Sequence, residues 1–378
     1  MRVAIFSDSF SPVVNGVAVS INALIDELRA RGHSAHIFTT GFRGYKDPDP
    51  NVYRFPSVGL PLFPGYPLAI PPFYFALRNF RKHQFDIIHT HTPYTVGFVG
   101  LRWAESHEIP IVSTYHTLYD RYAHYVPYMP KVYTRYKIAK HTNYYYNRCR
   151  HVIAPSEPAA QALRRHSVRT PVTIIPTGNP ELRDMSKDEA RKQIGARPGD
   201  RILLYVGRVA KEKNIPLLVE AVAQVLLASP NLRFFMVGDG PFRKQAQQMA
   251  RDFGVGDQVR FAGAVARSEV DKYYLASDLF VFASTTETQG LVVGEAMTYG
   301  LPTVAVHGGG ASASIRDGSN GFIVGNSAGA LAEKIDEVMS NGVLRAQLSA
   351  CARASVKSWT HSDSCDQVLR VYEEVLGK

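Results

Sequence analysis

The sequence predicts an α/β protein with two doubly wound parallel sheets that follow one another along the chain. Short apolar runs alternate with longer segments whose apolar residues recur at helical spacing, and this alternation begins again in the second half. Alternating strands and helices produce a parallel sheet that helices cover on both faces. The length of 378 residues exceeds what one hydrophobic core usually holds and suits two domains.

The first series of elements ends at Pro176. A helix is expected over Val17–Arg31, because Ile21, Leu24 and Leu28 fall on one helical face, and Gly32 ends it. The other apolar runs are short and read as buried strands. The expected strands are Arg2–Ser7, His36–Thr40, Asp86–Thr90, Ile109–Thr114, His151–Pro155 and Val172–Pro176.

The second series follows a boundary near Pro176–Asp184, where Gly178–Asn179–Pro180 has the composition of a turn. The expected strands are Arg201–Val206, Leu232–Val237, Gln258–Ala262, Asp278–Ala283 and Pro302–Ala305. The expected helices are Ile215–Ala228, Pro241–Phe253, Leu291–Tyr299 and Ala328–Met339. In open α/β sheets ligands bind beyond the carboxyl ends of strands, so the loops after the strands should carry the chemistry.

The composition excludes several classes of protein. Hydrophobic residues make up 45% and charged residues 20%, which argues against disorder, collagen-like repeats and a disulfide scaffold. The apolar stretch Tyr66–Leu77 is interrupted by prolines, so no transmembrane helix is expected. The chain has three cysteines, Cys149, Cys351 and Cys365. Their spacing fits neither a zinc site nor a redox pair, and a reducing cytoplasm is the expected location.

The positive charge is concentrated in the first half of the chain. The net charge is +10, yet residues 181–378 hold 23 basic and 23 acidic side chains. Residues 121–150 have no acid; their basic residues and tyrosines are Arg121, Lys131, Arg135, Lys137, Lys140, Arg148, Arg150, Tyr122, Tyr125, Tyr128, Tyr133, Tyr136, Tyr144, Tyr145 and Tyr146. This composition is typical of contact with an anionic membrane surface. An RNA, an acidic acceptor or a solvated helix face are the alternatives.

Three loops of the first half contain candidate functional residues. The loop after the first strand lacks the GxGxxG of a dinucleotide site, but Asn15 and Gly16 open a helix whose amides favour an anion. The alternative is a plain strand-to-helix turn. His89 and His91 form a pair that suggests a metal, but the sequence shows no carboxylate cluster near them, which disfavours a metal site. His116, at the start of a loop, is the better reactive candidate, with a buried structural histidine as the alternative.

Two loops of the second half favour a phosphorylated, hydroxylated ligand. Arg208 and Lys213 follow the strand ending at Val206, and their cations suit a diphosphate; a solvated basic loop is the alternative. Glu287 and Glu295 flank a helix start, where carboxylates accept hydrogen bonds from sugar hydroxyls and the amides of residues 289–291 meet phosphate. A surface acidic pair is the alternative there. Asp47–Pro48–Asp49 is interpreted as a loop and not as a metal site.

These motifs together resemble the family 4 retaining glycosyltransferases. The resemblance rests on Pro-x-x-Asn-Gly, His-x-His-x-Pro, Tyr-His-Thr, Gly-Arg-(x4)-Lys-Asn and Glu-(x7)-Glu, in that order along nearly the whole chain. It implies the GT-B architecture, with two Rossmann-like domains and an interdomain cleft. Within the family, the segments around Tyr115–Tyr125 and Thr286–Gly290 look most like enzymes acting on diacylglycerol or other membrane lipids.

The resemblance also implies roles for individual residues. Arg208 and Lys213 hold the donor diphosphate, which Asn15 and Gly16 border. Glu295 binds the ribose, and His116 lies beside the transferred sugar. The donor sugar is held by the segment Glu287, Thr288, Gln289, Gly290 and Leu291. The segment departs from the family pattern at Gln289 and Gly294, where an aromatic and a bulky aliphatic residue are usual, and Asn179 stands where Asp is common.

The function expected from this resemblance is transfer of a hexose, with glucose as the first choice, from a UDP-sugar to a membrane lipid such as diacylglycerol. The anomeric configuration is kept, and neither a cofactor nor a metal is expected. Residues 1–178 with a terminal helix near 359–378 form the acceptor-binding domain, and residues 179–358 bind the donor. The protein is expected at the inner face of the cytoplasmic membrane, attached through residues 121–150, without a nucleic-acid partner. A polysaccharide or small-molecule acceptor, an epimerase and a nucleotide-sugar sensor are the alternatives.

Overall fold

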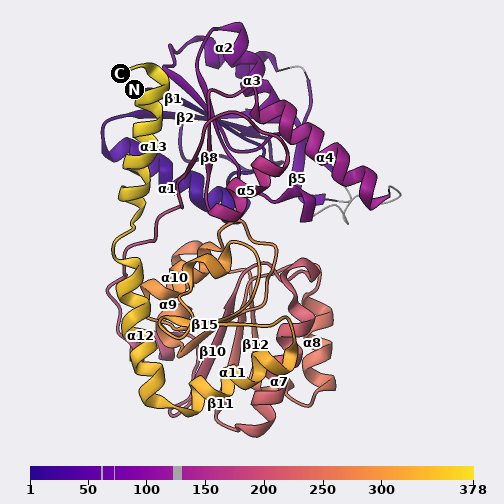
Figure 1. The fold of residues 1–378 in the computed structure, drawn as a ribbon, viewed down its shortest axis with the longest axis vertical. Coiled ribbons are helices and arrows are strands. Elements are labelled where there is room, and N and C mark those ends of the chain that lie inside the picture. Colours follow the sequence, from indigo (N-terminus) through magenta and orange to yellow (C-terminus); the bar gives the residue numbers. More distant parts are fainter. Residues whose placement is uncertain (61–62, 72, 122–129) are drawn as a thin grey trace. The chain divides into compact units, whose positions relative to one another are not determined.

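The computed structural model describes residues 1–60, 63–71, 73–121 and 130–378. The chain forms two compact units, each with its own parallel sheet (Figure 1). One contains Met1–Gly178 together with His361–Lys378, and the other contains Asn179–Thr360. The chain therefore leaves the first unit once and returns to it with its last helix.

The first unit is built on a parallel sheet with the strand order β3-β2-β1-β6-β7-β8-β9. Its strands are β1 (Arg2–Ser7), β2 (Ser34–Thr40), β3 (Val52–Phe55), β6 (Ile87–Thr90), β7 (Ile111–Thr114), β8 (His151–Ala154) and β9 (Val172–Ile174). The strands expected from apolar runs are present, with ends shifted by one or two residues at most. β3 was not predicted, because its residues are mostly half-buried at the sheet edge and give no apolar run.

Helices cover this sheet, and a small antiparallel hairpin lies beside it. The helices are α1 (Gly16–Ala30), α2 (Tyr74–Arg81), α3 (Thr95–Ser106), α4 (Lys131–Tyr146), α5 (Glu157–Arg165) and α13 (His361–Leu376), and the hairpin strands are β4 (Ser57–Leu60) and β5 (Phe63–Ala69). α1 follows the expected apolar spacing, with Ile21, Ile25 and Leu28 buried. α13 packs beside α1 (Figure 1), where Arg31 forms an ion pair of 3.0 Å with Asp366.

An aromatic cluster forms much of the core of the first unit. Phe6 and Phe38, on neighbouring strands, stack with ring centroids 4.7 Å apart, and Phe80 and Trp103 pack against them edge-on. Phe6, Phe38 and Phe80 are almost fully buried. Burial of each such ring contributes about 1.5–3 kcal/mol. The cluster therefore fixes α2 and α3 against β1 and β2.

Asp8 holds the loop after β6 against the end of β1. Its carboxylate accepts hydrogen bonds from the Thr92 hydroxyl at 2.6 Å and from the backbone N–H of Val96 at 2.9 Å, in the first turn of α3. Burial raises the pKa of Asp8, while these hydrogen bonds lower it. Because β1 and β6 are neighbours, this contact links the two strands at the carboxyl edge of the sheet.

The second unit repeats the arrangement with the strand order β12-β11-β10-β13-β14-β15. Its strands are β10 (Arg201–Val206), β11 (Leu232–Val237), β12 (Val259–Gly263), β13 (Leu279–Phe282), β14 (Thr303–Val306) and β15 (Gly321–Val324). β10 and β11 have the bounds expected from the sequence. β15 was not predicted, because it is short and two of its four residues are only half-buried.

The helices of the second unit lie on both sides of this sheet (Figure 1). They are α6 (Lys187–Gln193), α7 (Ile215–Ala228), α8 (Arg243–Asp252), α9 (Arg267–Ala276), α10 (Leu291–Thr298), α11 (Ala328–Ser340) and α12 (Gly342–Val356), with short 3₁₀ turns η2 (Lys211–Lys213), η3 (Gly256–Gln258) and η4 (Ala311–Ser314). α7 is buried along most of its length. The expected helices at 215–228, 241–253, 291–299 and 328–339 correspond to α7, α8, α10 and α11.

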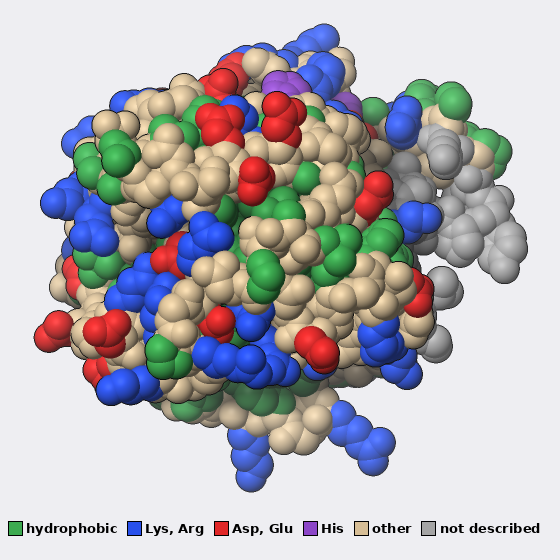
Figure 2. Space-filling model, turned by 90° about the horizontal axis from the view of Figure 1, so that it is seen from below, with side chains coloured by type: hydrophobic (Ala, Val, Ile, Leu, Met, Phe, Trp, Pro, Cys, Tyr) green, Lys and Arg blue, Asp and Glu red, His purple; other side chains and the backbone are tan. Residues whose placement is uncertain are grey.

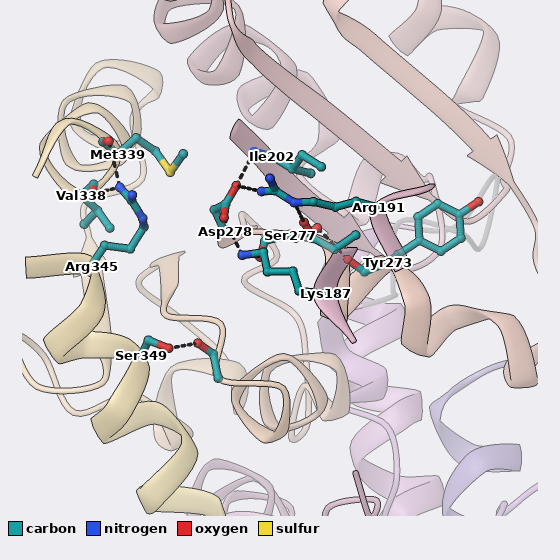
Figure 3. Close-up of polar contacts among 12 residues, drawn as sticks. Lys187, Arg191, Ile202, Tyr273, Ser277, Asp278, Val338, Met339, Arg345 and Ser349 are labelled. Carbon is teal, nitrogen blue, oxygen red and sulfur yellow. Dashed lines mark hydrogen bonds and ion pairs between the residues drawn. The ribbon is translucent and has the colours of Figure 1, made fainter. Parts of the chain in front are cut away.

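Asp278 anchors α6 to the amino end of the second sheet (Figure 3). Its carboxylate lies 2.6 Å from the Lys187 ammonium and 2.8 Å from the Arg191 guanidinium, and it accepts the backbone N–H of Ile202 at 2.8 Å. The Ser349 hydroxyl, in α12, donates a hydrogen bond of 2.6 Å to the backbone carbonyl of Gly300 (Figure 3). Since ligands bind at the opposite, carboxyl edge of such sheets, we assign these charges a structural role.

The surface of the described residues carries both signs of charge. On the face shown in Figure 2, Lys and Arg side chains lie among Asp and Glu side chains. In the described part of the chain, no helix is both long enough and apolar enough to cross a membrane.

Candidate functional site

The predicted donor-binding residues of the second unit lie at the point where the strand order changes direction. β10 has β11 on one side and β13 on the other. Arg208 and Lys213 lie in the loop after β10, and Glu287 lies in the loop after β13. In doubly wound folds this point, at the carboxyl edge, is where ligands bind.

Lys213 and Glu287 are brought into direct contact there. The Lys213 ammonium lies 2.6 Å from Oε1 of Glu287, and the two side chains are only 15% and 21% exposed. Arg208 pairs more loosely with Glu212, at 3.8 Å, and is 44% exposed. The backbone carbonyl of Arg208 accepts a hydrogen bond from the buried Tyr205 hydroxyl at 2.9 Å, which fixes the start of the loop.

The segment 287–291 forms a tight entry into α10. Gly290 has φ +75°, a left-handed conformation that favours glycine, and an added Cβ would lie 2.6 Å from Cβ of Ala311. α10 begins at Leu291, so Thr288, Gln289 and Gly290 lie directly before its amino end. The positive end of the helix dipole is therefore next to Glu287 and Lys213.

A glycine-rich loop that the sequence analysis did not single out supports this segment. The backbone N–H of Gly310 donates to the carbonyl of Glu287 at 2.6 Å. A Cβ on Gly310 would lie 1.8 Å from the carbonyl oxygen of Thr288, so no other residue fits without movement. Three consecutive glycines, 308–310, directly follow the region of β14, and this was the signal available in the sequence.

Glu295 lies deeper than Glu287 and is held by two residues that the sequence analysis missed. Oε2 accepts a hydrogen bond from the Tyr274 hydroxyl at 2.8 Å, and Oε1 accepts one from the Arg267 guanidinium at 3.2 Å. Burial raises the pKa of Glu295, and Arg267 and Tyr274 oppose this rise. Both partners lie in α9, whose sequence has no motif that would have linked them to Glu295.

Asn15 and Gly16 lie in the first unit, at the amino end of α1. Oδ1 of Asn15 accepts a hydrogen bond from the backbone N–H of Ala18 at 2.9 Å, and its Nδ2 donates to the Ser9 hydroxyl at 2.8 Å. Asn15 is therefore an N-cap, which accounts for its residue type on structural grounds. Gly16 is the first residue of the helix.

The three predicted histidines form one cluster in the first unit, in which His89 and His91 are buried and His116 is half-buried. The rings of His89 and His91 lie 4.1 Å apart, and those of His91 and His116 stack at 5.1 Å. His89 contacts the hydroxyls of Tyr372 at 2.6 Å and Thr114 at 2.7 Å through its two nitrogens. Burial lowers the pKa of His89 to about 3 and that of His116 to about 4, so both rings are neutral at pH 7.

The residues weighed as metal ligands have other partners. Asp47 forms a two-point ion pair with Arg54 at 2.7 Å, and Asp49 pairs with Arg29 at 2.7 Å. Across the parts of the chain that the structure describes, no three His, Cys, Asp or Glu side chains are grouped to hold a metal ion. The Asp-x-Asp motif thus belongs to a loop held in place by arginines.

The basic, tyrosine-rich segment forms α4 in its described part; Tyr122, Tyr125 and Tyr128 lie outside the described residues. Exposed cations lie over exposed tyrosine rings four residues earlier, with Lys137 above Tyr133 at 5.3 Å and Lys140 above Tyr136 at 4.9 Å. α4 also borders a cavity of about 550 Å³. Its lining includes Tyr94, Tyr119, Lys137, Ile138, Lys140 and His141.

Family models match both halves of the chain. The model for Glycosyltransferase Family 4 matches residues 14–179, and the model for Glycosyl transferases group 1 matches residues 186–355. Two solved structures have a similar fold over nearly all of both chains. Sucrose-phosphate synthase from Thermosynechococcus elongatus has a TM-score of 0.83 at 22% identity and covers 100% of this chain and 99% of its own. Anabaena Alr3699/HepE in complex with UDP and glucose has a TM-score of 0.78 at 20% identity, with 99% and 100% covered.

Two relatives have closer sequences. The alpha-monoglucosyldiacylglycerol synthase of Streptococcus pneumoniae is 35% identical over 322 residues, which cover 82% of this chain and 71% of the relative. The synthase of the same name from Acholeplasma laidlawii is 32% identical, with 97% of this chain and 96% of the relative covered. With the family models and the structural neighbours, these relatives show that the chain belongs to glycosyltransferase family 4 and has the GT-B fold.

Proposed function

We propose that the protein is a retaining hexosyltransferase that moves glucose from UDP-glucose to a membrane lipid such as diacylglycerol, without a metal ion. In this proposal the second unit binds the donor and the first unit binds the acceptor. Arg208 and Lys213 hold the diphosphate, Glu295 the ribose, and Glu287 with residues 288–291 the sugar. Gly16 borders the diphosphate, and His116 lies beside the transferred sugar.

The observation that carries the donor assignment is the position of Lys213. Its ammonium lies at the carboxyl edge of the second sheet, where the strand order reverses, and contacts Glu287 just before the start of α10. A cation, a carboxylate and a helix amino end in one place suit a ligand with both phosphate and hydroxyl groups. A nucleotide sugar has both kinds of group.

The proposed mechanism depends on stabilising the leaving group. As the bond from the sugar to the diphosphate breaks, negative charge grows on the phosphate and positive charge on the sugar ring. Arg208, Lys213 and the amino end of α10 stabilise the growing negative charge, and this lowers the barrier because they are already in place. The leaving phosphate then accepts the proton of the acceptor hydroxyl, which attacks from the same face and keeps the anomeric configuration.

A lipid acceptor is supported by the relatives and by α4. Two relatives above 30% identity are named alpha-monoglucosyldiacylglycerol synthase. α4 exposes Arg135, Lys137 and Lys140 beside Tyr133 and Tyr136, a combination that favours an anionic membrane surface. The cavity next to α4 has the size and the aromatic lining of a ligand pocket.

A donor and acceptor panel tests the proposal. The protein is incubated with UDP-glucose, UDP-galactose or GDP-mannose, each with and without vesicles containing diacylglycerol, and nucleotide release and glycolipid are measured. We expect UDP-glucose to be consumed only when diacylglycerol is present, and we expect the reaction to continue when EDTA removes metal ions. NMR should show that the glucose in the product is α-linked. Lys213→Ala is the matched inactive control.

Each alternative has its own outcome in the same panel. Transfer to a soluble sugar or polysaccharide, but not to lipid, would replace the lipid acceptor in the proposal. Conversion of the donor into another sugar nucleotide without acceptor would indicate an epimerase. Tight donor binding with no nucleotide released under any condition would indicate a sensor. A β-linked product would contradict retention.

A further inference from the structure

His91 has one hydrogen-bonded nitrogen and one that lacks a partner among the described residues. Its Nδ1 lies 2.8 Å from Nε2 of His116. Its Nε2 is buried and has no hydrogen-bond partner in the described part of the chain, and the residue is only 2% exposed. By contrast, both nitrogens of the neighbouring His89 contact hydroxyl groups. Among the described residues, the His91 ring thus has a hydrogen bond to His116, and it also packs against His89.

The contact between His91 and His116 requires one shared proton. Burial lowers the pKa of both rings, so each is neutral near pH 7 and carries a single N–H. The nitrogens that face each other therefore hold one proton between them. Either His116 donates to His91 through Nε2, or His91 donates to His116 through Nδ1.

The unpartnered nitrogen of His91 decides between the two arrangements. If His116 donated, His91 would carry its own proton on Nε2, where no protein group among the described residues accepts a hydrogen bond. If His91 donates, its Nε2 carries a lone pair that accepts no hydrogen bond from a described residue. Buried N–H groups without an acceptor are the rarer defect in proteins, so the second arrangement is favoured.

We propose that His91 is a positioning residue that donates its Nδ1 proton to His116 and thereby keeps the proton of His116 on Nδ1. This inference rests on the proposed function, in which His116 lies beside the transferred sugar. With Nε2 occupied and Nδ1 protonated, His116 has no nitrogen left to accept a proton. His116 then acts as a fixed hydrogen-bond donor and not as a general base.

Nitrogen NMR tests the tautomer without any variant or substrate. Protein labelled with ¹⁵N at histidine distinguishes protonated from unprotonated ring nitrogens by chemical shift. We expect Nδ1 of both His91 and His116 to be protonated and Nε2 of both to be unprotonated. A proton on Nε2 of His116 would overturn the inference.

Two substitutions at His91 test the consequence for turnover. The side-chain amide nitrogen of Asn occupies the place of Nδ1 and can donate, whereas Leu cannot. We expect His91→Leu to lower kcat about tenfold or more while the Kd for UDP-glucose stays unchanged, and His91→Asn to recover most of that loss. Equal losses in both variants would contradict a role through hydrogen bonding.

Tyr372→Phe serves as the control for general damage to the cluster. It removes the hydroxyl bonded to His89, whose ring lies 4.1 Å from His91, and leaves the contact between His91 and His116 in place. The tautomer of His116 should stay the same in this variant. If the wild-type protein transfers no sugar at all, the proposed function fails, while the NMR experiment still decides where the proton lies.

Discussion

Lys213→Ala should remove most of the catalytic rate, and the structure gives a reason for the size of the loss. The Lys213 ammonium is one of two cations at the carboxyl edge of the second sheet that we assign to the departing diphosphate. Removing one preorganised charge-stabilising group typically costs about 10²–10³ in rate, or about 2.7–4 kcal/mol. We therefore expect kcat/KM for UDP-glucose to fall about 100-fold or more.

The same substitution should also cost some stability, because Glu287 loses its cation. The two side chains are 15% and 21% exposed. The pair thus lies between exposed pairs, worth about 0–1 kcal/mol, and buried pairs, whose disruption costs about 3–5 kcal/mol. A loss near the lower of these limits, about 1 kcal/mol, would lower Tm by about 2–4 °C in a domain of this size.

The assay follows nucleotide release at low donor concentration with diacylglycerol vesicles, and Tm is measured on the same samples. Lys211→Ala is the matched control, because Lys211 belongs to the same 3₁₀ turn and is exposed. Adding Glu287→Gln to Lys213→Ala should restore stability but not activity. Activity of Lys213→Ala within threefold of the wild type, or an equal loss in Lys211→Ala, would refute the assignment.

Three further predictions concern the supporting loop, the buried histidines and α4. Gly310→Ala should lower the free energy of unfolding by about 1–3 kcal/mol and reduce activity, since its Cβ would lie 1.8 Å from the Thr288 carbonyl oxygen. The control is Gly325→Ala, whose Cβ would meet no described atom within 4 Å and which should leave the thermal melting temperature nearly unchanged. Stability should fall as the pH is lowered from 6.5 towards 4, by up to about 1.4 kcal/mol per pH unit for each of His36 and His116. The reason is that burial lowers the pKa of both side chains in the folded protein to about 4, so the unfolded chain binds more protons in this range. A free energy of unfolding in urea that stays constant between pH 7 and 5 would contradict this prediction. Removing three cations of α4 should weaken binding to anionic vesicles by about 100-fold at low salt, at about 1 kcal/mol per cation, while removing three exposed lysines of the second unit should not. Sedimentation with vesicles compares the α4 set, Arg135, Lys137 and Lys140, with the control set, Lys192, Lys244 and Lys357.

Much of the fold was predictable because buried parallel strands leave a strong local pattern. β10 and β11 are mostly apolar, each with one arginine near its start, and their bounds agree with those expected from the sequence. β3 and β15 were not predicted, because short, half-buried edge strands have no continuous apolar stretch. The spacing of apolar residues along a segment indicates how that segment is buried, and it gives little information about strands that are only partly covered.

The residues of the candidate site could be proposed one by one from the sequence, but the contacts between them could not. Arg208, Lys213 and Glu287 were each selected because they follow a strand and have suitable chemistry. Glu295 is bound by Arg267 and Tyr274, and no sequence motif pointed to these two partners. An arginine in a helix is usually a surface residue and a tyrosine is usually a core residue, so neither suggests a role at the site.

The amino-acid order alone determined the two α/β series and the chemical types gathered after their strands, because helical and strand periodicity are local properties. Only the tertiary structure decided which of these residues touch. Lys213 and Glu287 are 74 positions apart, and His91 and His116 are 25 apart. They meet because β10 lies beside β13 and β6 lies beside β7, and strand neighbours in a sheet are chosen by packing between distant segments.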